Sequence, residues 1–317
     1  MKILFTGGSS FTGCGFIREL ARAGHEVVAT FRQQPEHYDD PLRRERVALA
    51  LKHADGVFDC SFGDDGFVEL VGSASWDLLC HHAANVTNYK SEDFDVDAAL
   101  AANTRNLARV LDGLHQGSSA APAVLLTGSV FENDEGRGAD GETDLQAFSP
   151  YGLSKGLTYQ VFRYRCRQAG LPLGKFVIPN PFGPLEEPRF TAYLMRNWFA
   201  GATPSVNTPD YVRDNVHISL LAAAYRNYAE QLVQGAAALR FNPSGYVETQ
   251  GAFAERFAAA MRDRLGLPCK LDLRTQTDFG EPLKRVNTDT LDPTALGWDE
   301  ADAWDAVAAY YKAKLQA

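Results

Sequence analysis

Short apolar runs alternate with longer segments of helical period along the first half of the chain, and this alternation constrains the fold more than any other feature. The helical segments include residues 14–23, 96–114 and 151–169. Strands that are apolar on both faces are covered by helices on both sides, so the pattern predicts an α/β fold with a doubly wound parallel sheet. The predicted strands are residues 2–6, 26–30, 57–59, 77–80, 123–127 and 174–178.

A proline-rich segment marks the end of this regular pattern. Residues 179–188, PNPFGPLEEP, contain four prolines, and the later sequence mixes helices with isolated short strands. We therefore expect two domains, a sheet domain over residues 1–178 and a smaller α/β domain over residues 179–317. The run ALRFN at residues 238–242 is predicted to return to the first sheet as an extra strand.

The charge balance and the cysteines exclude several classes of protein. The formal net charge is −9, and the two basic runs, RRER at 43–46 and RYRCR at 163–167, are expected to be solvated helix faces, so no nucleic-acid partner is predicted. The five cysteines form no CxxC pair, which predicts neither a disulfide framework nor a metal site. No run is long enough to span a membrane, and the first strand starts at Lys2 with no room for a signal peptide, so a cytoplasmic protein is expected.

A loop rich in glycine and hydroxyl groups, GGSSFTG at residues 7–13, follows the first strand and precedes a helix. Gly7 and Gly13 take the first and third positions of a G-x-x-G-x-x-G pattern, and Ser10 stands in the middle position. Such a turn brings backbone N–H groups and a helix N-terminus close to a pyrophosphate, which favours a dinucleotide site. The alternative is a tight turn with a structural role only.

The end of the second predicted strand bears on which dinucleotide binds. NAD sites usually carry an acidic residue there, about 20 residues past the glycines, to bind the ribose hydroxyls. In this chain the strand ends with Phe31 and Arg32, and an arginine can pair with a 2′-phosphate. NADP is therefore favoured over NAD, with an ordinary exposed arginine as the alternative.

The segment SPYGLSKG places Tyr151 and Lys155 four residues apart on one face of a helix. We expect the ammonium to lower the pKa of the phenol and to make it a usable general acid or base. Thr127, at the end of a strand 24 residues earlier, can hydrogen-bond the same substrate oxygen. These three residues are the predicted catalytic set.

Eight motifs in this order resemble those of the extended short-chain dehydrogenases/reductases, the nucleotide-sugar epimerase/dehydratase family, over nearly the whole chain. The resemblance implies a Rossmann-type doubly wound sheet with a smaller C-terminal α/β substrate-binding domain. The motifs are FTGGSSFTG, VFDCSF, DLLCHHAA, NTRNL, LLTGSVF, YGLSK, PNPFGP and VRDNVHI.

The resemblance also implies roles in cofactor binding. Asp59 and Cys60 would face the adenine, Asn103 would organise the catalytic water and the lysine, and Lys155 would bridge the nicotinamide ribose hydroxyls. Alternatives stay open: Asp59 as a turn cap, Asn103 as a polar helix residue, and His81 and His82 as satisfied strand residues on opposite faces. The expected cofactor set is Gly7, Ser10, Phe11, Thr12, Gly13, Arg32, Asp59, Cys60, Ala83, Ala84, Asn103 and Lys155.

For the substrate, the resemblance implies a nucleoside-diphosphate sugar held by Asn180, Arg213 and Arg285, although Arg213 could instead pair internally. The chain departs from the family at several positions: no arginine precedes Asn180, Phe131-Glu132 replaces the usual Tyr-Gly, and Ser219 replaces an aspartate. Relatives often pair through two helices per subunit, so a homodimer is expected.

One departure bears on the reaction. The family's 4,6-dehydratases carry an acidic pair directly after the catalytic threonine, where this chain has Gly128 and Ser129. Neither can replace a tuned carboxylic acid, so dehydration is not expected. An NAD(P)-dependent 4-keto reductase or 4-epimerase is predicted. The alternatives are an NADPH-dependent reductase of a steroid- or flavonoid-like alcohol, and a non-catalytic NADP sensor or scaffold.

Overall fold

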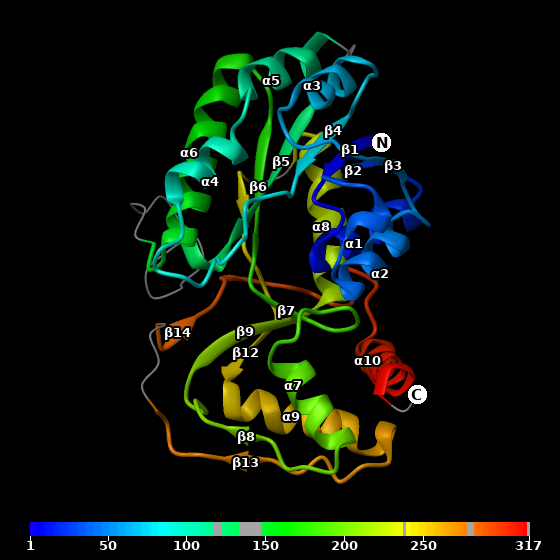
Figure 1. Cartoon of the computed structure of the whole chain (residues 1–317), viewed down its shortest axis with the longest axis vertical. Helices are drawn as coiled ribbons and strands as arrows, with labels where there is room; N and C mark the ends of the chain where they lie inside the picture. The colour runs from blue at the N-terminus through cyan, green and yellow to red at the C-terminus, as the bar shows by residue number, and fades with distance from the viewer. Residues whose placement is uncertain (117–121, 133–146, 237–238, 278–281, 316–317) are drawn as a thin grey trace.

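The computed structural model describes residues 1–116, 122–132, 147–236, 239–277 and 282–315. Its main feature is a seven-stranded, wholly parallel sheet in the order β10-β6-β5-β4-β1-β2-β3 (Figure 1). The predicted doubly wound sheet is therefore confirmed. The strands are β1 (Lys2–Thr6), β2 (Glu26–Thr30), β3 (Asp55–Val57), β4 (Leu78–His81), β5 (Ala123–Ser129), β6 (Leu173–Ile178) and β10 (Arg240–Phe241).

Helices cover both faces of this sheet, because its strands are apolar on both faces. One core cluster lies between the sheet and the helices α1 (Phe11–Arg22), α2 (Pro41–Ala50) and α8 (Ile218–Val233). A second lies under α3 (Asp65–Gly72), α5 (Leu107–Gln116) and α6 (Pro150–Ala169). The α4 helix (Val96–Asn103) packs beside α6.

Two elements from the second half of the chain pack onto this sheet. The α8 helix lies along α1, where Tyr225 stacks on Phe16 with ring centroids 4.0 Å apart. Strand β10 pairs with β6, with Arg240 and Phe241 opposite Lys175 and Phe176. Ala238, in the run predicted to form this strand, lies outside the described residues, and the division of the chain at residue 178 stays a prediction.

The rest of the second half forms a smaller α/β unit below the main sheet (Figure 1). Strand β9 (Val212–His217) pairs with β7 (Asn180–Phe182) and β14 (Lys284–Arg285) in parallel and with β12 (Tyr246–Thr249) antiparallel. A third core cluster lies among α7 (Phe190–Phe199), α9 (Gln250–Leu265) and α10 (Glu300–Leu315). The remaining short strands are β8 (Ser205–Val206), β11 (Pro243–Ser244), β13 (Asp272–Leu273) and β15 (Asp289–Thr290).

Two sequence predictions about helices were wrong. Residues 96–114 are not one helix: α4 ends at Asn103, and Asn106 has a positive φ of 49°, which separates it from α5. The basic run at 43–46 is not wholly solvated, because Arg46 is fully buried and donates two hydrogen bonds to the Leu185 carbonyl at 2.9 and 2.7 Å. Arg46 therefore fastens α2 to the loop after β7.

No helix in the described part of the chain is long and apolar enough to cross a membrane.

Candidate active site

The glycine-rich turn and the Ala83–Ala84 loop lie at the carboxyl ends of β1 and β4, which are neighbouring central strands. The chain winds away from this point in both directions, and such a reversal of strand order is where doubly wound sheets bind ligands. The loops after β1 and β4 are held together by Thr6. Its Oγ1 accepts hydrogen bonds from the backbone N–H groups of His82 and Ala83 at 3.1 and 3.0 Å.

The glycine-rich turn after β1 is built for close backbone packing. Gly7 has a φ of +85°, and a Cβ on it would lie 2.8 Å from the Ala83 nitrogen. A Cβ on Gly13 would lie 2.2 Å from the Gly7 oxygen. Ser10 caps α1 by accepting a hydrogen bond from the Gly13 N–H at 3.0 Å. A helix N-terminus that follows a glycine turn thus lies at the switch point, which fits a dinucleotide pyrophosphate.

His82 connects this turn to the predicted catalytic threonine. Its Nε2 lies 3.0 Å from Ser10 Oγ and 3.1 Å from Thr12 Oγ1, and its Nδ1 lies 2.9 Å from Thr127 Oγ1. Burial lowers the pKa of His82 to about 3, so the ring is neutral. His81 points to the other face of the sheet, where its ring centroid lies 3.9 Å from that of Phe62. Opposite faces were predicted for these neighbouring residues. The bridging role of His82 was not predicted.

The residues predicted to contact the adenosine lie at the ends of β2 and β3. Asp59 is exposed with a φ of 50°, and its carboxylate accepts a hydrogen bond from Gln34 at 2.6 Å. The Cys60 side chain packs into the core under α3 and α5, where burial raises the pKa of its thiol to about 11. Phe31 is buried, and Arg32 after it is exposed.

Tyr151 lies in the first turn of α6, which Ser149 caps by accepting a hydrogen bond from the Gly152 N–H at 3.1 Å. Its ring is surrounded by Tyr89, Phe94 and Phe131, with centroids 5.4, 5.8 and 6.0 Å away. A hydrogen bond with Ser129 lowers the pKa of the Tyr151 phenol, whereas the Thr127 hydroxyl contacts His82 Nδ1 at 2.9 Å. Sequence reasoning treated Ser129 only as a missing acid.

The expected depression of the Tyr151 pKa is not found. Burial raises the pKa of this phenol, and the Glu132 charge and Tyr89 raise it further, while Arg189 and the Ser129 hydrogen bond lower it. Desolvation of the phenolate therefore outweighs the nearby positive charge. Lys155, one turn along α6, is itself buried, and burial lowers its pKa to about 8.

Asn103 is buried at the end of α4 and joins the loop after β4 to α6. Its Oδ1 accepts a hydrogen bond from the Asn85 N–H at 3.1 Å, and its Nδ2 donates to Thr158 Oγ1 at 3.2 Å. Thr158 lies three residues after Lys155. Asn103 therefore holds α6 in position relative to the loop after β4.

The two arginines predicted to contact phosphate lie side by side. Arg213 of β9 and Arg285 of β14 are register partners on adjacent parallel strands. The Arg285 guanidinium lies 4.1 Å from the centre of the Phe131 ring, which in turn packs against Tyr151. Arg213 donates to the Val212 carbonyl at 2.9 Å and lies over the Tyr211 ring at 4.5 Å. The structure thus links Arg285 to the predicted catalytic tyrosine through one aromatic ring.

Asn180 and Arg189 lie on the loop and strand that follow β6. Asn180, in β7, donates a hydrogen bond to Asn215 of β9 at 2.5 Å, so its amide is oriented by the strand that carries Arg213. Arg189 donates to the Tyr89 hydroxyl at 3.4 Å and lowers the pKa of Tyr151 by its charge. Arg189 is a cation at the site that sequence reasoning missed, because no local motif marks it.

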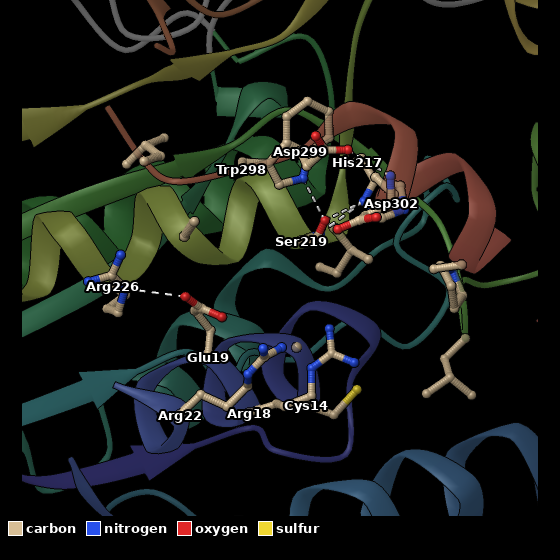
Figure 2. Close-up of a pocket in the computed structure, with 18 of the residues that line it drawn as sticks. Cys14, Arg18, Glu19, Arg22, His217, Ser219, Arg226, Trp298, Asp299 and Asp302 are labelled. Atoms are coloured by element: carbon tan, nitrogen blue, oxygen red, sulfur yellow. Dashed lines mark hydrogen bonds and ion pairs between the residues drawn. The ribbon is translucent and has the colours of Figure 1, made fainter. Parts of the chain in front are cut away.

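A separate cavity of about 520 Å³ lies between α1, α8 and the start of α10 (Figure 2). Arg18 and Arg22 line it from α1, while Trp298 and Asp302 line it from the opposite side. Phe11 is the single predicted site residue in its lining. The cavity is therefore distinct from the Tyr151 site. Within the described ranges, no cluster of three or more histidine, cysteine or acidic residues could hold a metal ion.

Comparison with known proteins places the whole chain in one structural group. UDP-glucuronic acid 4-epimerase from Bacillus cereus is 15% identical, with a TM-score of 0.72 over 99% of this chain and 100% of that one. UDP-glucose 4-epimerase from Thermotoga maritima is 16% identical, with a TM-score of 0.70 over 99% and 100%. The dTDP-glucose 4,6-dehydratase DesIV from Streptomyces venezuelae is 20% identical, with a TM-score of 0.67 over 99% and 97%. At such identities these likenesses show the fold.

The sequence itself carries the family assignment. No curated protein matches it as a relative. The sequence model of the NAD dependent epimerase/dehydratase family matches residues 3–242, which include the glycine-rich turn, Tyr151 and Lys155, and Arg213. Together with the fold, this match shows that the chain belongs to the NAD-dependent epimerase/dehydratase family.

Proposed function

We propose that this protein is an NAD(P)-dependent oxidoreductase that acts at a carbinol or ketone carbon of a nucleotide-activated sugar, as a 4-epimerase or 4-keto reductase. The observation that carries the proposal is the chain of contacts from Tyr151 through Phe131 to Arg285. It joins a candidate proton donor to a pair of cations suited to a diphosphate. The named structural neighbours act on UDP- and dTDP-sugars, which supports the same substrate class.

In this proposal Tyr151 moves the proton of the reacting oxygen. When bound, the dinucleotide supplies or accepts the hydride. The hydroxyls of Ser129 and Thr127 orient the sugar, and Lys155 supplies positive charge beside the phenol. The aromatic ring set of Tyr89, Phe94 and Phe131 excludes water around Tyr151, which strengthens these interactions.

The dinucleotide would be held by the turn at Gly7–Gly13, the loop of Ala83 and Ala84, and Lys155. We propose NADP as the preferred form, because the exposed Arg32 ends β2 where NAD sites usually carry an acid. A reductase consumes NADPH in each turnover, whereas an epimerase keeps NAD and returns the hydride to a transient ketone. Arg32 therefore supports reduction.

The dinucleotide that co-purifies with the protein, identified with its redox state, tests this choice. Tightly held NAD would indicate an epimerase, and an empty site that takes up NADPH would indicate a reductase.

A thermal-shift panel of UDP, GDP, CDP and dTDP tests the substrate class. One of them should raise the melting temperature by mass action. If none does so up to millimolar concentration, the nucleotide-sugar proposal is wrong and a reductase of apolar alcohols becomes the better explanation.

We also propose a homodimer, with α6 in the interface. Leu153 and Tyr164 are 37% and 50% exposed on this helix, and they offer apolar surface to a partner subunit. Light scattering after size exclusion would contradict this proposal if it gave the monomer mass at micromolar concentration.

A further inference from the structure

A buried ion pair lies behind the site, between the 3₁₀ turn η2 (Val130–Glu132) and strand β6. Glu132 accepts from the Lys175 ammonium, and the two side chains are 6% and 3% exposed. The other Glu132 oxygen accepts a hydrogen bond from the Ser129 N–H at 2.7 Å. The Lys175 ammonium also lies 4.2 Å from the centre of the Tyr159 ring. Each charge is thus paired, as burial requires.

The ion pair fills the space beside Gly128. A Cβ on Gly128 would lie 2.6 Å from Lys175 Cε and 2.8 Å from Glu132 Oε1. Gly128 stands where the family's dehydratases carry the first residue of their acidic pair, and Glu132 stands where the family usually has glycine. The two positions at which the chain departs from the family pattern, Gly128 and Glu132, therefore lie next to each other.

The pair is held close to the catalytic helix. A Cβ on Gly152 would lie 1.8 Å from the Phe131 oxygen, so η2 and the first turn of α6 pack as closely as backbones can. The structure therefore fixes Glu132 beside the turn that carries Tyr151. Lys155 follows on the same helix.

The charges that face Lys155 come from three elements. Glu132 of η2 raises its pKa, and Lys175 of β6 lowers it by a smaller amount. His81 of β4 and His82, which follows it, also act on Lys155, but burial keeps both rings neutral. The balance of charge around the Lys155 ammonium is therefore decided by the ion pair.

We propose that Glu132 and Lys175 form a positioning pair that, through the close packing of η2 on α6, holds the first turn of α6 and Lys155 at the reacting atoms. This role rests on the proposed function only in assigning Lys155 to the catalytic set. Glu132 and Lys175 do not contact the substrate. They act through Lys155, by electrostatics and by the fixed position of η2.

The titration of Lys155 followed by NMR with lysine labelled at Cε and Nζ tests this role without any substrate. The signal is assigned by its loss in Lys155→Arg. We expect a midpoint near pH 8 in the wild type. Glu132→Gln should lower it and Lys175→Met should raise it, each by about one pH unit. The exposed ion pair of Lys2 and Glu26 offers a control: Glu26→Gln should leave the midpoint unchanged.

Either single variant could fail to fold, because each leaves one buried charge without a partner. The double variant Glu132→Gln/Lys175→Met removes both charges. Since Glu132 has the larger effect on Lys155, the double variant should still lower the midpoint, by less than Glu132→Gln alone. A midpoint within about 0.3 pH unit of the wild type in every folded variant would overturn the proposal.

The pH profile of turnover adds a second readout. In Glu132→Gln the alkaline limb of kcat should move to lower pH, because the ammonium is lost earlier, while KM stays nearly constant. A shifted Lys155 titration in a protein that turns over no nucleotide sugar would contradict the proposed function alone. Turnover with an unmoved Lys155 titration would contradict the positioning pair alone.

Discussion

Arg213 and Arg285 face each other across the parallel strands β9 and β14, although 72 residues of sequence separate them. Arg213 donates to the carbonyls of Val212, Pro282 and Leu283, and the Arg285 guanidinium lies 4.1 Å from the centre of the Phe131 ring. Their shared register places two cations on neighbouring strands, which supports the proposal of a substrate with two adjacent phosphates.

Replacing either arginine by glutamine should weaken the binding of the active nucleoside diphosphate by about 10- to 100-fold, since a hydrogen bond to a charged group contributes about 1.5–3 kcal/mol. The double variant should lose less than the product of the two effects, because the residues are neighbours. Calorimetric titration measures both. Arg262→Gln, on α9, is the matched control and should bind normally. Equal binding by all three single variants would exclude a diphosphate at this position.

Tyr151→Phe should reduce turnover by at least about 100-fold, which is the usual contribution of a positioned proton donor. Cofactor affinity should change little, because only one hydroxyl is lost. Steady-state kinetics and fluorescence titration of the reduced dinucleotide provide the two measurements. If the variant kept most of its activity, another group would have to move the proton.

Arg32→Ala should weaken NADPH binding by about 10-fold or more and leave NADH binding nearly unchanged, because only NADPH carries the 2′-phosphate. Lys52→Ala, at another exposed cation, is the control. Parallel titrations with both dinucleotides give the ratio of the two affinities. An equal loss for both would contradict the NADP preference.

Glu186 should make the stability of the protein depend on pH. Its buried carboxyl accepts hydrogen bonds from Tyr311 of α10 at 2.7 Å and from Thr191 of α7, and burial raises its pKa to about 7. The folded chain therefore holds this proton more tightly than the unfolded chain, whose pKa is 4.5. The contribution of Glu186 to the free energy of unfolding is fully present below pH 4.5. It is lost as pH rises through 7 and amounts to at most about 3 kcal/mol.

Glu186→Gln should remove this dependence, since a neutral amide can still bond both hydroxyls. Urea unfolding of the wild type and the variant at pH 5 and pH 8 measures it. The variant should gain stability relative to the wild type at pH 8. A constant difference between the two proteins across this range would show that Glu186 keeps the same charge throughout.

No 4-keto-6-deoxy product should accumulate from a nucleotide hexose, because Gly128 and Ser129 carry no acid to remove and donate protons at the sugar carbons. Glu132 does not replace them, since one of its oxygens pairs with Lys175 and the other with the Ser129 N–H. Mass spectrometry of the reaction mixture checks this. A product 18 mass units lighter than the substrate would show that dehydration occurs.

Features encoded by neighbouring residues could be predicted from the sequence. The apolar runs predicted the inner strands of the parallel sheet, because strands buried on both faces need apolar residues. The edge strand β3 was predicted at residues 57–59 but spans Asp55–Val57. The spacing of Tyr151 and Lys155 was enough to place both on the first turns of one helix. The turn between β1 and α1 could be predicted because its glycine pattern lies within seven residues.

Features made by residues far apart in the sequence could not be predicted. Glu132 and Lys175 are 43 residues apart, and His82 contacts Ser10 and Thr127 across 72 and 45 residues. The burial of Arg46 depends on a carbonyl 139 residues away. In the sequence each of these residues looks like an ordinary polar residue, because its partner is brought to it only by folding.

The order in which the sheet is completed has a consequence for synthesis on the ribosome. Its last strand, β10, and the helix that covers Phe16, α8, lie beyond residue 217. Until they emerge, the nascent amino-terminal half exposes the β6 edge of the sheet and the apolar surface that α8 will cover, and both can pair with other chains. A chain shortened to end near residue 178 should therefore yield insoluble material.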